Sequence, residues 1–560
     1  MPSALDLKFE TVLDAVTGPG GPIQIGRDDN GRAIVQNFPQ TLPAFFDAFC
    51  ALNADTIGVI SNGERLTFAE LNAVATRVAK ALIGGHGVKK GDRVAIAMRN
   101  CTAWIVSYIA VVKAGGIAVL INGWWQADEL AHGLALTEPV LVLADAPRAA
   151  RIAATGVAGA ILTLHIDQPI EGAMAPVLDR DGENAALPDV SPEDDATILF
   201  TSGSTGLSKG AVSTHRAVCN ATYAYTISLI CLKGILESEG RPPVNPPRTL
   251  VCVPLFHVTG EVPVMLNSFV IARGLVLMPK WDAGEALRLI EQETVTYFVG
   301  VPTMSLELMQ HPDRDKYDLS SLTDIAAGGA ARPVAHVKRL QESFATAQPA
   351  LGYGLTETNA TGCGNFWSNY AAKPASTGRA QAPLVEVAIF GAEDRHMPVG
   401  ERGEIGIRGA GNIHAYWRNP EATATLFTPD GYVRTGDIGY LDEDGYLFIV
   451  DRKKDIIIRG GENISCQEVE AAIYAHPAVS EAAVFGLSDE RLGEVPGAVV
   501  YCEHRQGLDE EGLRVFLEQR LARFKIPAVL WFVDEPLPKL GTGKIDKVVL
   551  RDAYRARAAA

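Results

Sequence analysis

Residues 198–210 read Ile198-Leu199-Phe200-Thr201-Ser202-Gly203-Ser204-Thr205-Gly206-Leu207-Ser208-Lys209-Gly210, and this segment is the sharpest local signal in the sequence. A short apolar strand runs directly into a loop of glycines, hydroxyl side chains and a single lysine. Glycine lets backbone N–H groups approach an anion closely, and the hydroxyls donate further hydrogen bonds. The segment therefore predicts a cradle for a chain of phosphates. Its expected contacts are Thr201, Ser202, Gly203, Ser204, Thr205, Gly206 and Lys209.

The spacing of this loop differs from that of the P-loop NTPases. In those proteins glycine precedes the lysine and Ser or Thr follows it, whereas Ser208 and Gly210 flank Lys209 here. The alternative is a flexible linker of Gly and Ser. A linker rarely follows a buried strand directly or carries a lysine in this position, so we favour the phosphate cradle.

Composition and charge set limits on the class of protein. The chain has 560 residues, enough for several domain-sized units and a large core. Hydrophobic residues make up 47% and charged residues 21%, which excludes a disordered chain, a collagen-like chain and a small disulfide scaffold. The net charge of −16 argues against a nucleic-acid-binding protein with a broad basic surface. It still allows an anionic ligand held by a few local cations.

The cysteines and the apolar segments bear on location. No two of the 8 cysteines form a CxxC pair, so we expect no structural zinc site. The first residues lack the basic region and apolar run of a signal peptide. The longest apolar stretch, 104–121, contains Lys113 and a Gly-Gly pair, which predicts a buried helix, a turn and a strand rather than a membrane span. We therefore expect a cytoplasmic protein with reduced thiols and no transmembrane segment.

Helix and strand patterns alternate through most of the chain. Helices are predicted at 68–82 and 103–113, and strands at 93–98, 117–121 and 140–144. Such alternation is typical of α/β layers built on parallel strands.

The character of the sequence changes near residue 450. A strand candidate at 445–450 is followed at once by a charged segment, which by itself is often only a solvated turn. Further on, the patterns predict helices at 467–474 and 508–523 and strands at 481–487, 497–502 and 529–533. The expected fold is α/β, with a large N-terminal multi-subdomain α/β domain, residues 1–450, and a small mobile C-terminal α+β domain, residues 451–560.

Seven further motifs bear on identity. They are Phe256-His257, Gly328-Gly329-Ala330, Gly352-Tyr353-Gly354-Leu355-Thr356-Glu357, Thr435-Gly436-Asp437, Asp451-Arg452-Lys453-Lys454, Gly460-Gly461-Glu462 and Pro538-Lys539-Leu540-Gly541-Thr542-Gly543-Lys544. With the TSGSTGLSKG loop they resemble, in order, the motifs of the adenylate-forming superfamily, which includes acyl-CoA synthetases, luciferases and peptide-synthetase adenylation domains. Each motif is weak alone, but their shared order is specific. One departure is Cys466, where the family usually has proline, and we expect only a local backbone effect.

The resemblance implies a reaction in two steps. A carboxylate attacks the α-phosphate of ATP, which gives an acyl-adenylate and pyrophosphate, and a thiol then displaces AMP. Because one anion must approach a polyanion, cations and hydrogen-bond donors must offset both charges. The expected substrates are a small-molecule carboxylic acid, ATP and coenzyme A, with Mg²⁺ as cofactor. No nucleic acid is expected as a partner.

The resemblance also implies the nucleotide contacts. Lys209 would hold the β- and γ-phosphates, Thr356 a phosphate, and Glu357 the magnesium ion. Two motifs would enclose adenine, and Tyr353 would offer a stacking face. These motifs are Gly328, Gly329 and Ala330, and Gly352, Tyr353 and Gly354. Asp437 and Arg452 would contact the ribose.

Three residues are predicted to carry the chemistry, Lys544, Thr356 and His257. Lys544 lies in a glycine-flanked loop, and the resemblance implies that it swings as a point charge onto the carboxylate and the α-phosphate. His257 would border the carboxylate of the acid. The alternatives are a solvated loop lysine and an ordinary core histidine.

The remaining roles concern coenzyme A, the acyl chain and the hinge. Gly460 and Gly461 would line the pantetheine tunnel, with Lys280 and Lys454 as basic contacts for coenzyme A. Alternatively, Lys280 is a surface lysine. His257, Gly362 and Cys363 would begin the acyl pocket, and Asp451 would be the hinge of the C-terminal domain.

The identity of the acid is the most open point. No acidic residue follows His257 before Glu261, which disfavours an amino acid. A medium- or long-chain fatty acid is favoured, with an aryl or other bulky apolar acid as the alternative. The sequence also leaves open a carrier-protein-loading ligase, a luciferase-like adenylating enzyme and a non-catalytic nucleotide-binding regulator. A homodimer and a peripheral membrane contact stay open as well.

Overall fold

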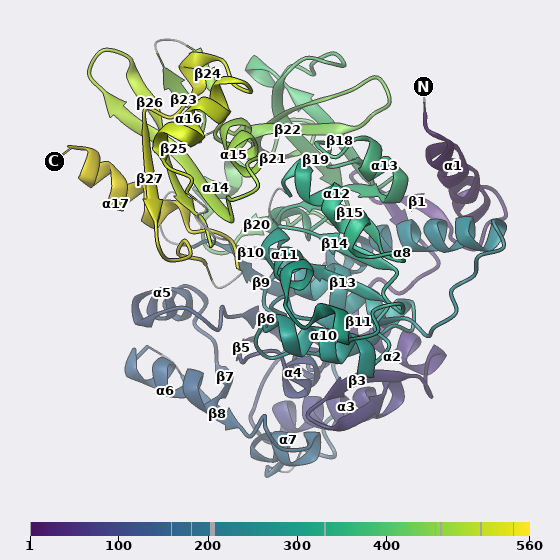
Figure 1. Cartoon of the computed structure of the whole chain (residues 1–560). Helices are drawn as coiled ribbons and strands as arrows, with labels where there is room; N and C mark the ends of the chain where they lie inside the picture. The colour runs from purple at the N-terminus through teal and green to yellow at the C-terminus, as the bar shows by residue number, and fades with distance from the viewer. Residues whose placement is uncertain are drawn as a thin grey trace.

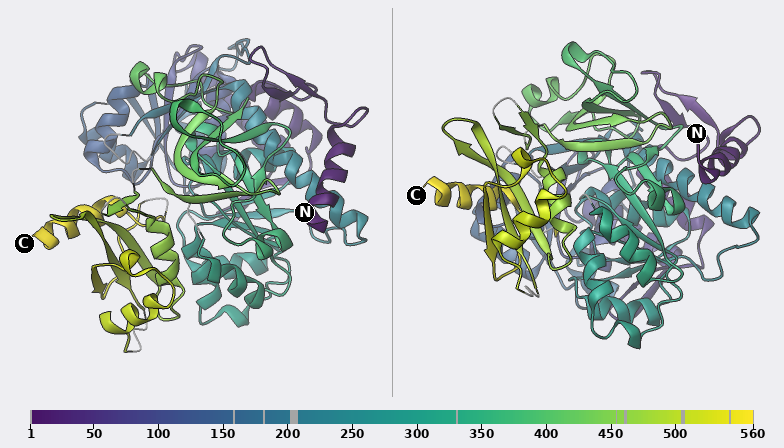
Figure 2. Two further views of the ribbon diagram at one scale, coloured as in Figure 1. Left: turned by 90° about the horizontal axis from the view of Figure 1, so that it is seen from above. Right: turned by 45° about the horizontal axis from the view of Figure 1, so that its top comes forward.

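The structure is a computed structural model that describes residues 2–157, 159–180, 182–201, 208–329, 332–453, 455–459, 462–503, 507–540 and 543–559. A large body is formed by the chain up to about residue 450, and the yellow C-terminal part forms a smaller lobe (Figure 1). The two views of Figure 2 show this lobe as a distinct body on one side of the molecule. The α/β class with a large N-terminal part and a smaller C-terminal part is confirmed.

The first sheet of the large body has seven strands in the order β20-β10-β9-β6-β5-β7-β8. These strands are β5 (Arg93–Ala97), β6 (Ile117–Leu120), β7 (Leu141–Asp145), β8 (Ala160–Leu164), β9 (Asp195–Phe200), β10 (Gly210–Thr214) and β20 (Ala415–Tyr416). Strands β5 to β9 pair in parallel, and β10 turns back antiparallel to β9. Thr201 and Lys209, two of the residues that were predicted to hold phosphate, therefore lie at the facing ends of these two antiparallel strands.

The second sheet has nine strands in the order β17-β16-β15-β14-β13-β11-β12-β3-β4. They are β3 (Ile57–Ser61), β4 (Glu64–Thr67), β11 (Arg248–Val251), β12 (Gly274–Leu277), β13 (Tyr297–Gly300), β14 (Asp324–Ala327), β15 (Gln348–Gly354), β16 (Gly362–Phe366) and β17 (Arg379–Ala380). The central strands are parallel, and β16 runs antiparallel to β15. The glycine motifs of the site lie at the ends of β14 and β15.

Besides the short pair of β1 (Ile25–Arg27) and β2 (Ala33–Val35), two smaller sheets contain the remaining strands. The first is the order β18-β19-β21-β22, made of β18 (Val385–Phe390), β19 (Gly403–Gly409), β21 (Val433–Leu441) and β22 (Leu447–Arg452). The second lies in the C-terminal lobe and contains β23 (Ile457–Arg459), β24 (Glu462–Ile464), β25 (Glu481–Asp489), β26 (Gly493–Tyr501) and β27 (Val529–Val533). Strand β22 is the last strand before the C-terminal lobe.

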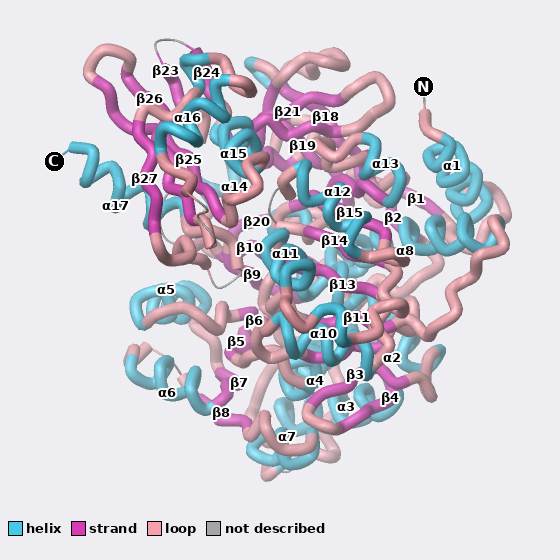
Figure 3. The backbone as a smooth tube through the Cα atoms, viewed as in Figure 1, coloured by secondary structure: helices cyan, strands magenta, loops and turns pink. Residues whose placement is uncertain are grey.

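Helices separate these sheets, as the cyan segments between the magenta strands show (Figure 3). In the large body they are α1 (Ala4–Thr17), α2 (Leu42–Leu52), α3 (Phe68–Gly84), α4 (Thr102–Lys113), α5 (Ala127–Thr137), α6 (Ala146–Ala154), α7 (Ile170–Leu178), α8 (His215–Ser238), α9 (Asn267–Val270), α10 (Ala283–Gln292), α11 (Pro302–Gln310), α12 (Val334–Ser343), α13 (Trp367–Ala372) and α14 (Pro420–Ala424). The C-terminal lobe adds α15 (Cys466–Tyr474), α16 (Glu510–Glu518) and α17 (Lys547–Ala559). Short helical turns include the π-helix η1 (Gly260–Leu266) and the 3₁₀ turns η3 (Thr356–Thr358) and η5 (Arg523–Lys525).

The apolar stretch 104–121 belongs to the core of the large body. Every residue of α4 is buried, and the chain then turns and enters β6, as predicted. A helix that is apolar on all sides must be enclosed by protein or lipid. Helices α2, α3 and α7 enclose α4. Among the residues that the structure describes, no helix is long and apolar enough to cross a membrane.

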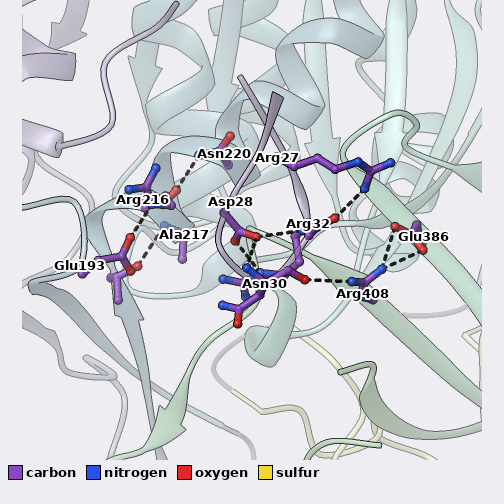
Figure 4. A network of polar contacts seen from close by, with 12 residues as sticks. Arg27, Asp28, Asn30, Arg32, Glu193, Arg216, Ala217, Asn220, Glu386 and Arg408 are labelled. Atoms are coloured by element: carbon purple, nitrogen blue, oxygen red, sulfur yellow. Dashed lines mark hydrogen bonds and ion pairs between the residues drawn. The ribbon is translucent and has the colours of Figure 1, made fainter. Parts of the chain in front are cut away.

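The N-terminal segment packs against the four-stranded sheet β18-β19-β21-β22 through the hairpin of β1 (Ile25–Arg27) and β2 (Ala33–Val35). Figure 4 shows Arg408 of β19 donating to the Asn30 carbonyl at 3.1 Å and pairing with Glu386 of β18 at 3.2 Å. Within the hairpin turn, Arg32 pairs with Asp28 at 2.7 Å. Residues that precede the two large sheets in sequence are thus fixed to strands near residue 400.

One predicted helix of the C-terminal lobe ends early. The expected helix 508–523 is α16, Glu510–Glu518, followed by a turn and the short η5. Leu521 nevertheless stays buried at 8% exposure, so the apolar spacing continues through the turn while the backbone leaves the helix. The prediction of the end at residue 523 was wrong because Ala522 adopts extended backbone angles.

Candidate active site

A cleft of about 820 Å³ lies between the large body and the C-terminal lobe. Thr201, His257 and Val301 line it from the large body, and Arg452 and Lys544 line it from the end of β22 and the C-terminal lobe. Side chains that lie far apart in the sequence therefore meet in one ligand-sized space.

Thr201, the first residue of the predicted phosphate cradle, lines this cleft. The N–H of Thr201 donates to the carbonyl of Lys209 at 3.0 Å, which closes the base of the hairpin loop. The pairing of Phe200 with Gly210 continues this closure into β9 and β10. Five predicted contacts lie outside the described residues, Ser202, Gly203, Ser204, Thr205 and Gly206. Their role in phosphate binding stays a prediction.

Lys209 and Glu357 are brought together by a residue that the sequence did not reveal. The Lys209 ammonium lies 4.4 Å from the centre of the Tyr416 ring, a cation–π contact. The Tyr416 hydroxyl donates to Glu357 Oε1 at 2.7 Å. Tyr416 belongs to β20, which pairs with β10, so the sheet brings this ring beside the lysine. No local sequence pattern predicts this partner, because the contact depends on the pairing of two strands that lie about two hundred residues apart in the sequence.

Glu357 fits the single carboxylate that a nucleotide-bound magnesium ion requires. Mg²⁺ usually takes one or two protein carboxylates and fills its shell with phosphate oxygens and water. The described residues contain no group of three His, Cys, Asp or Glu side chains that could hold a metal without a substrate. Glu357 lies on η3 next to Thr356, and Tyr416 fixes its carboxylate. Bound there, the ion would neutralise phosphate charge.

We expect Tyr416→Phe to lower kcat/KM for ATP about tenfold. The variant keeps the ring beneath Lys209 but removes one hydrogen bond to the Glu357 carboxylate, which is worth about 1.5 kcal/mol. Pyrophosphate–ATP exchange at a series of magnesium concentrations measures the effect, and the variant should need more magnesium. Tyr440→Phe on β21 is the matched control. Equal kinetics for the two variants would remove Tyr416 from the site.

Gly328 and Gly352 belong to the two motifs that were predicted to enclose adenine, and both have room beside their backbone. A side chain added at Gly352 would meet no described atom within 4 Å, and one at Gly328 would come no closer than 3.8 Å to Thr259. Both positions therefore face open space. Gly354 differs, because an added carbon would lie 2.0 Å from the Ala360 carbonyl oxygen. The absence of a side chain at Gly354 thus serves local packing, and Ala330 lies outside the described residues.

The three residues that were predicted for adenine stacking and ribose binding form one contact chain. The Tyr353 hydroxyl donates to Asp437 Oδ2 at 2.6 Å. Arg452 Nε lies 3.5 Å from Asp437 Oδ1, and the two residues face each other across β21 and β22. Burial raises the pKa of Tyr353 well above its usual value, and the Asp437 charge adds to this, so the hydroxyl keeps its proton. Asp437 is thus oriented as an acceptor.

Lys544 extends from the C-terminal lobe to the backbone of Gly329. Its Cε would lie 3.0 Å and its Nζ 3.3 Å from a carbon added at Gly329. The Leu540 N–H donates to the Lys544 carbonyl at 2.7 Å, which closes the turn that carries the lysine. Burial lowers the pKa of Lys544 to about 8, with Arg452 contributing to the lowering and Asp437 opposing it. The lysine is thus held over the nucleotide surface.

His257 completes the reacting end of the cleft. Its Nδ1 accepts from the Thr259 N–H at 3.3 Å, which leaves the proton of a neutral ring on Nε2. Burial lowers the pKa of His257 to about 3, and the Lys544 charge contributes to the shift. A neutral donor and a lysine cation therefore stand close to each other, as binding of a carboxylate requires.

The predicted acyl-pocket residues Gly362 and Cys363 lie on β16 beside the nucleotide motif. A carbon added at Gly362 would lie 2.4 Å from the Tyr353 carbonyl oxygen, so strand pairing accounts for this glycine. Cys363 is buried at 1% exposure, and burial raises the pKa of its thiol. Neither residue is one of the described residues that line the cleft. Their part in acyl binding stays a prediction.

The predicted coenzyme A contacts are not brought together in this arrangement. Lys280 is exposed in the turn before α10 and does not line the cleft among the described residues. Lys454, Gly460 and Gly461 lie outside the described part of the chain. All four roles stay predictions.

Asp451 lies at the junction of the large body and the C-terminal lobe, and its carboxylate is hydrogen-bonded there. It is 1% exposed near the end of β22, and its carboxylate accepts from the backbone N–H of Arg452 at 2.7 Å and from that of Cys466. Burial raises the pKa of Asp451. Proline has no N–H, so cysteine at position 466 gains a backbone donor that the usual family residue lacks. The cysteine thus ties α15 to the predicted hinge.

Comparison with known proteins shows the family of the chain. The profile of the AMP-binding enzyme family matches residues 46–417, and that of the AMP-binding enzyme C-terminal domain matches residues 468–544. A long-chain-fatty-acid–CoA ligase of Bacillus subtilis (strain 168) is 34% identical over 538 residues, covering 90% of this chain and 93% of the relative. A feruloyl-CoA synthase of Amycolatopsis sp is 36% identical over 493 residues, covering 88% and 94%. The structure of ATP-bound MatB from Rhodopseudomonas palustris has a TM-score of 0.80 at 29% identity, covering 92% and 99%.

The fold and the site define a nucleotide-binding enzyme in two parts, and the matched profiles show that the chain belongs to the AMP-binding enzyme family. Within that family it is an acid–thiol ligase, an AMP-forming acyl-CoA synthetase.

Proposed function

We propose that the enzyme activates an apolar monocarboxylic acid, a medium- or long-chain fatty acid, as its adenylate and transfers the acyl group to coenzyme A. The observation that carries the first step is the position of Lys544 over the Gly329 surface, beside the Tyr353, Asp437 and Arg452 chain. The proposal divides the chain into two domains, residues 1–450 and residues 451–560. Mg²⁺ is the proposed cofactor.

In the first step the residues of the proposed site position two anions against each other. Asp437 accepts hydrogen bonds from the ribose hydroxyls, while Lys209 and Thr356 hold phosphate. His257 donates from Nε2 to the carboxylate of the acid. Lys544 then spans that carboxylate and the α-phosphate, where negative charge gathers as the new bond forms. Pyrophosphate leaves on the side of the 201–209 loop.

The second step requires the thiol of coenzyme A to attack the acyl carbon and release AMP. Lys544 occupies the space above the nucleotide surface, so its loop must withdraw before a thiol can enter. Rotation of residues 451–560 about Asp451 would bring Gly460 and Gly461 to the same place. Lys280 and Lys454 are the proposed cations for the nucleotide end of coenzyme A.

An apolar acid is supported by the wall of the cleft. The lining includes Leu120, Trp124, Trp125, Phe200 and Phe256. Two relatives named long-chain-fatty-acid–CoA ligase are 33–34% identical over most of this chain. These observations favour a fatty acid that lies along apolar side chains.

An aryl acid is the second candidate. Trp124 and Phe256 meet edge to face with ring centres 5.0 Å apart, and both line the cleft. Such a pair can pack on a flat ring. The feruloyl-CoA synthase relative at 36% identity supports the same class.

A panel of acids separates these candidates. Coenzyme-A-dependent AMP release would be measured with fatty, aryl, amino and dicarboxylic acids at equal concentration. We expect the fatty acids to give kcat/KM at least about tenfold above the other classes, because each buried CH₂ adds about 0.8 kcal/mol. A clear preference for an aryl acid would favour the second candidate. A preference for an amino acid or a diacid would refute both.

A further inference from the structure

A buried cation lies just beyond the nucleotide surface without a charged partner. Arg332 connects β14 to α12 and is 5% exposed. All three nitrogens of its guanidinium are buried and make no hydrogen bond of ordinary geometry to the described residues, and the uncharged Tyr370 hydroxyl is the described group that interacts with them. Burial lowers the pKa of Arg332. Among the described residues, Tyr370 is the group that acts on its charge, and no carboxylate does so. An arginine side chain keeps its charge in a protein.

Such a group needs a partner. A charge that is removed from water without an opposite charge or hydrogen bonds is strongly unfavourable. None of the nucleotide, acid or coenzyme A contacts proposed above uses Arg332. The reaction as described therefore does not account for it.

Two more polar groups without hydrogen bonds surround the guanidinium. Arg332 Cζ lies 6.0 Å from the centre of the Tyr370 ring. The Tyr370 hydroxyl is close enough to act on the arginine but makes no hydrogen bond within the described chain, and the same holds for His336 Nδ1. Tyr370 is fully buried and His336 is 5% exposed. Burial lowers the pKa of His336 to about 4, and the charges of Arg339 and Arg332 contribute to this, so the ring is neutral.

The cluster borders the ligand cleft through His336. Pro333 and His336 both line that cleft. Helix α12 begins here without a side-chain cap, and the start of a helix carries partial positive charge that attracts anions. Tyr474 of α15 meets the His336 ring edge to face at 6.2 Å. The C-terminal lobe therefore covers the cluster in the present arrangement.

We infer that Arg332, Tyr370 and His336 form a phosphate-binding site at the start of α12, separate from the cradle at residues 201–209. The free oxygens of a phosphate group match a guanidinium fork, a hydroxyl donor and a ring N–H together with the helix terminus. Two sources carry this chemistry into a coenzyme A ligase, free inorganic phosphate and the phosphates of coenzyme A. The Tyr474 contact ties access to the position of the C-terminal lobe.

A thermal-shift comparison of two variants tests the site. Arg332→Met removes the cation and keeps an unbranched side chain, and Lys338→Met removes a cation from a side chain that is 82% exposed on α12. Inorganic phosphate should raise the Tm of the wild type and of Lys338→Met above that in chloride at equal ionic strength, but not that of Arg332→Met. General salt effects act on all three proteins alike. Without phosphate, Arg332→Met should be at least as stable as the wild type, because an unpaired buried charge is gone.

Calorimetric titration with coenzyme A and with dephospho-coenzyme A then identifies the source. Affinity for coenzyme A that falls about tenfold in Arg332→Met, with dephospho-coenzyme A unaffected, assigns the 3′-phosphate. Equal weakening for both assigns the diphosphate. Unchanged affinity for both, with the loss of the phosphate-induced shift, assigns free phosphate.

The inference is overturned if neither phosphate nor coenzyme A gives a response that depends on Arg332. It is also overturned if Arg332→Met is less stable in phosphate-free buffer while the wild type gains nothing from phosphate, since the arginine would then serve packing alone. Arg332→Lys keeps the charge but loses the planar fork, and should retain part of the phosphate response. This variant keeps the test decisive if Arg332→Met does not fold.

Discussion

Lys544→Ala is expected to reduce adenylation by about 10²–10³-fold, equivalent to about 3–4 kcal/mol of lost stabilisation of the transition state. The lysine is the cation from the C-terminal lobe that reaches the nucleotide surface at Gly329. ATP affinity should stay within a few-fold of the wild type, because Tyr353, Asp437 and Arg452 are untouched. Pyrophosphate–ATP exchange measures the first effect and calorimetry the second.

Two further measurements isolate the role of Lys544. Thioester formation from a supplied acyl-adenylate should survive in Lys544→Ala, because the lysine must leave before the thiol enters. Lys525→Ala, which removes a lysine paired with Glu468 in the same lobe, should keep normal exchange. Exchange near the wild-type rate in Lys544→Ala would reject the assignment.

The pH dependence gives an independent readout. The free-enzyme pKa of Lys544 is lowered to about 8, and the lysine acts in its charged form. In the wild type, kcat/KM for adenylation should therefore fall as the pH rises through about 8. An exposed lysine with an ordinary pKa would place this fall near about pH 10. A flat profile between about pH 7 and 9 would contradict a catalytic cation at this position.

The order of motifs in the sequence predicts much of the nucleotide site, because each motif carries its own local chemistry. Tyr353, Asp437 and Arg452 were all named from their motifs, and the structure brings them into contact. The α/β class also follows from local periodicity, since strands such as β5 and β6 are largely apolar and α4 is buried on every side.

Contacts that depend on strand order could not be predicted in this way. Tyr416 meets Lys209 because β20 pairs with β10, and nothing near Tyr416 indicates that pairing. Arg332 is similar, since a lone arginine beside a glycine motif is normally a surface residue. Only the packing of α12 and α13 shows that it is buried. Such long-range contacts follow from the whole fold rather than from a local pattern.

The hinge is another case in which the structure changes the expectation. Asp451 stands at the end of a strand before a charged segment, which predicts a pivot. The structure shows that its carboxylate also accepts from the N–H of Arg452 and of Cys466. A substitution at this position therefore has two effects, one on backbone rotation and one on the attachment of α15. The two effects must be separated before a hinge can be inferred.

Asp451→Pro is expected to slow thioester formation about 10²-fold more than it slows pyrophosphate exchange, a difference of about 2.7 kcal/mol. Proline fixes φ near −65°, and so restricts the rotation that must exchange the Lys544 loop for the thiol path. The matched variant Asp451→Ala loses the same carboxylate but keeps the backbone free, so it should slow both steps alike, each by about tenfold for the lost hydrogen bonds. The proline effect beyond the alanine effect then reports the fixed φ and the lost N–H of residue 451. Equal rates for the two variants in both half-reactions would show that Asp451 anchors α15 without serving as a pivot, and the turning point of the lobe would have to lie elsewhere.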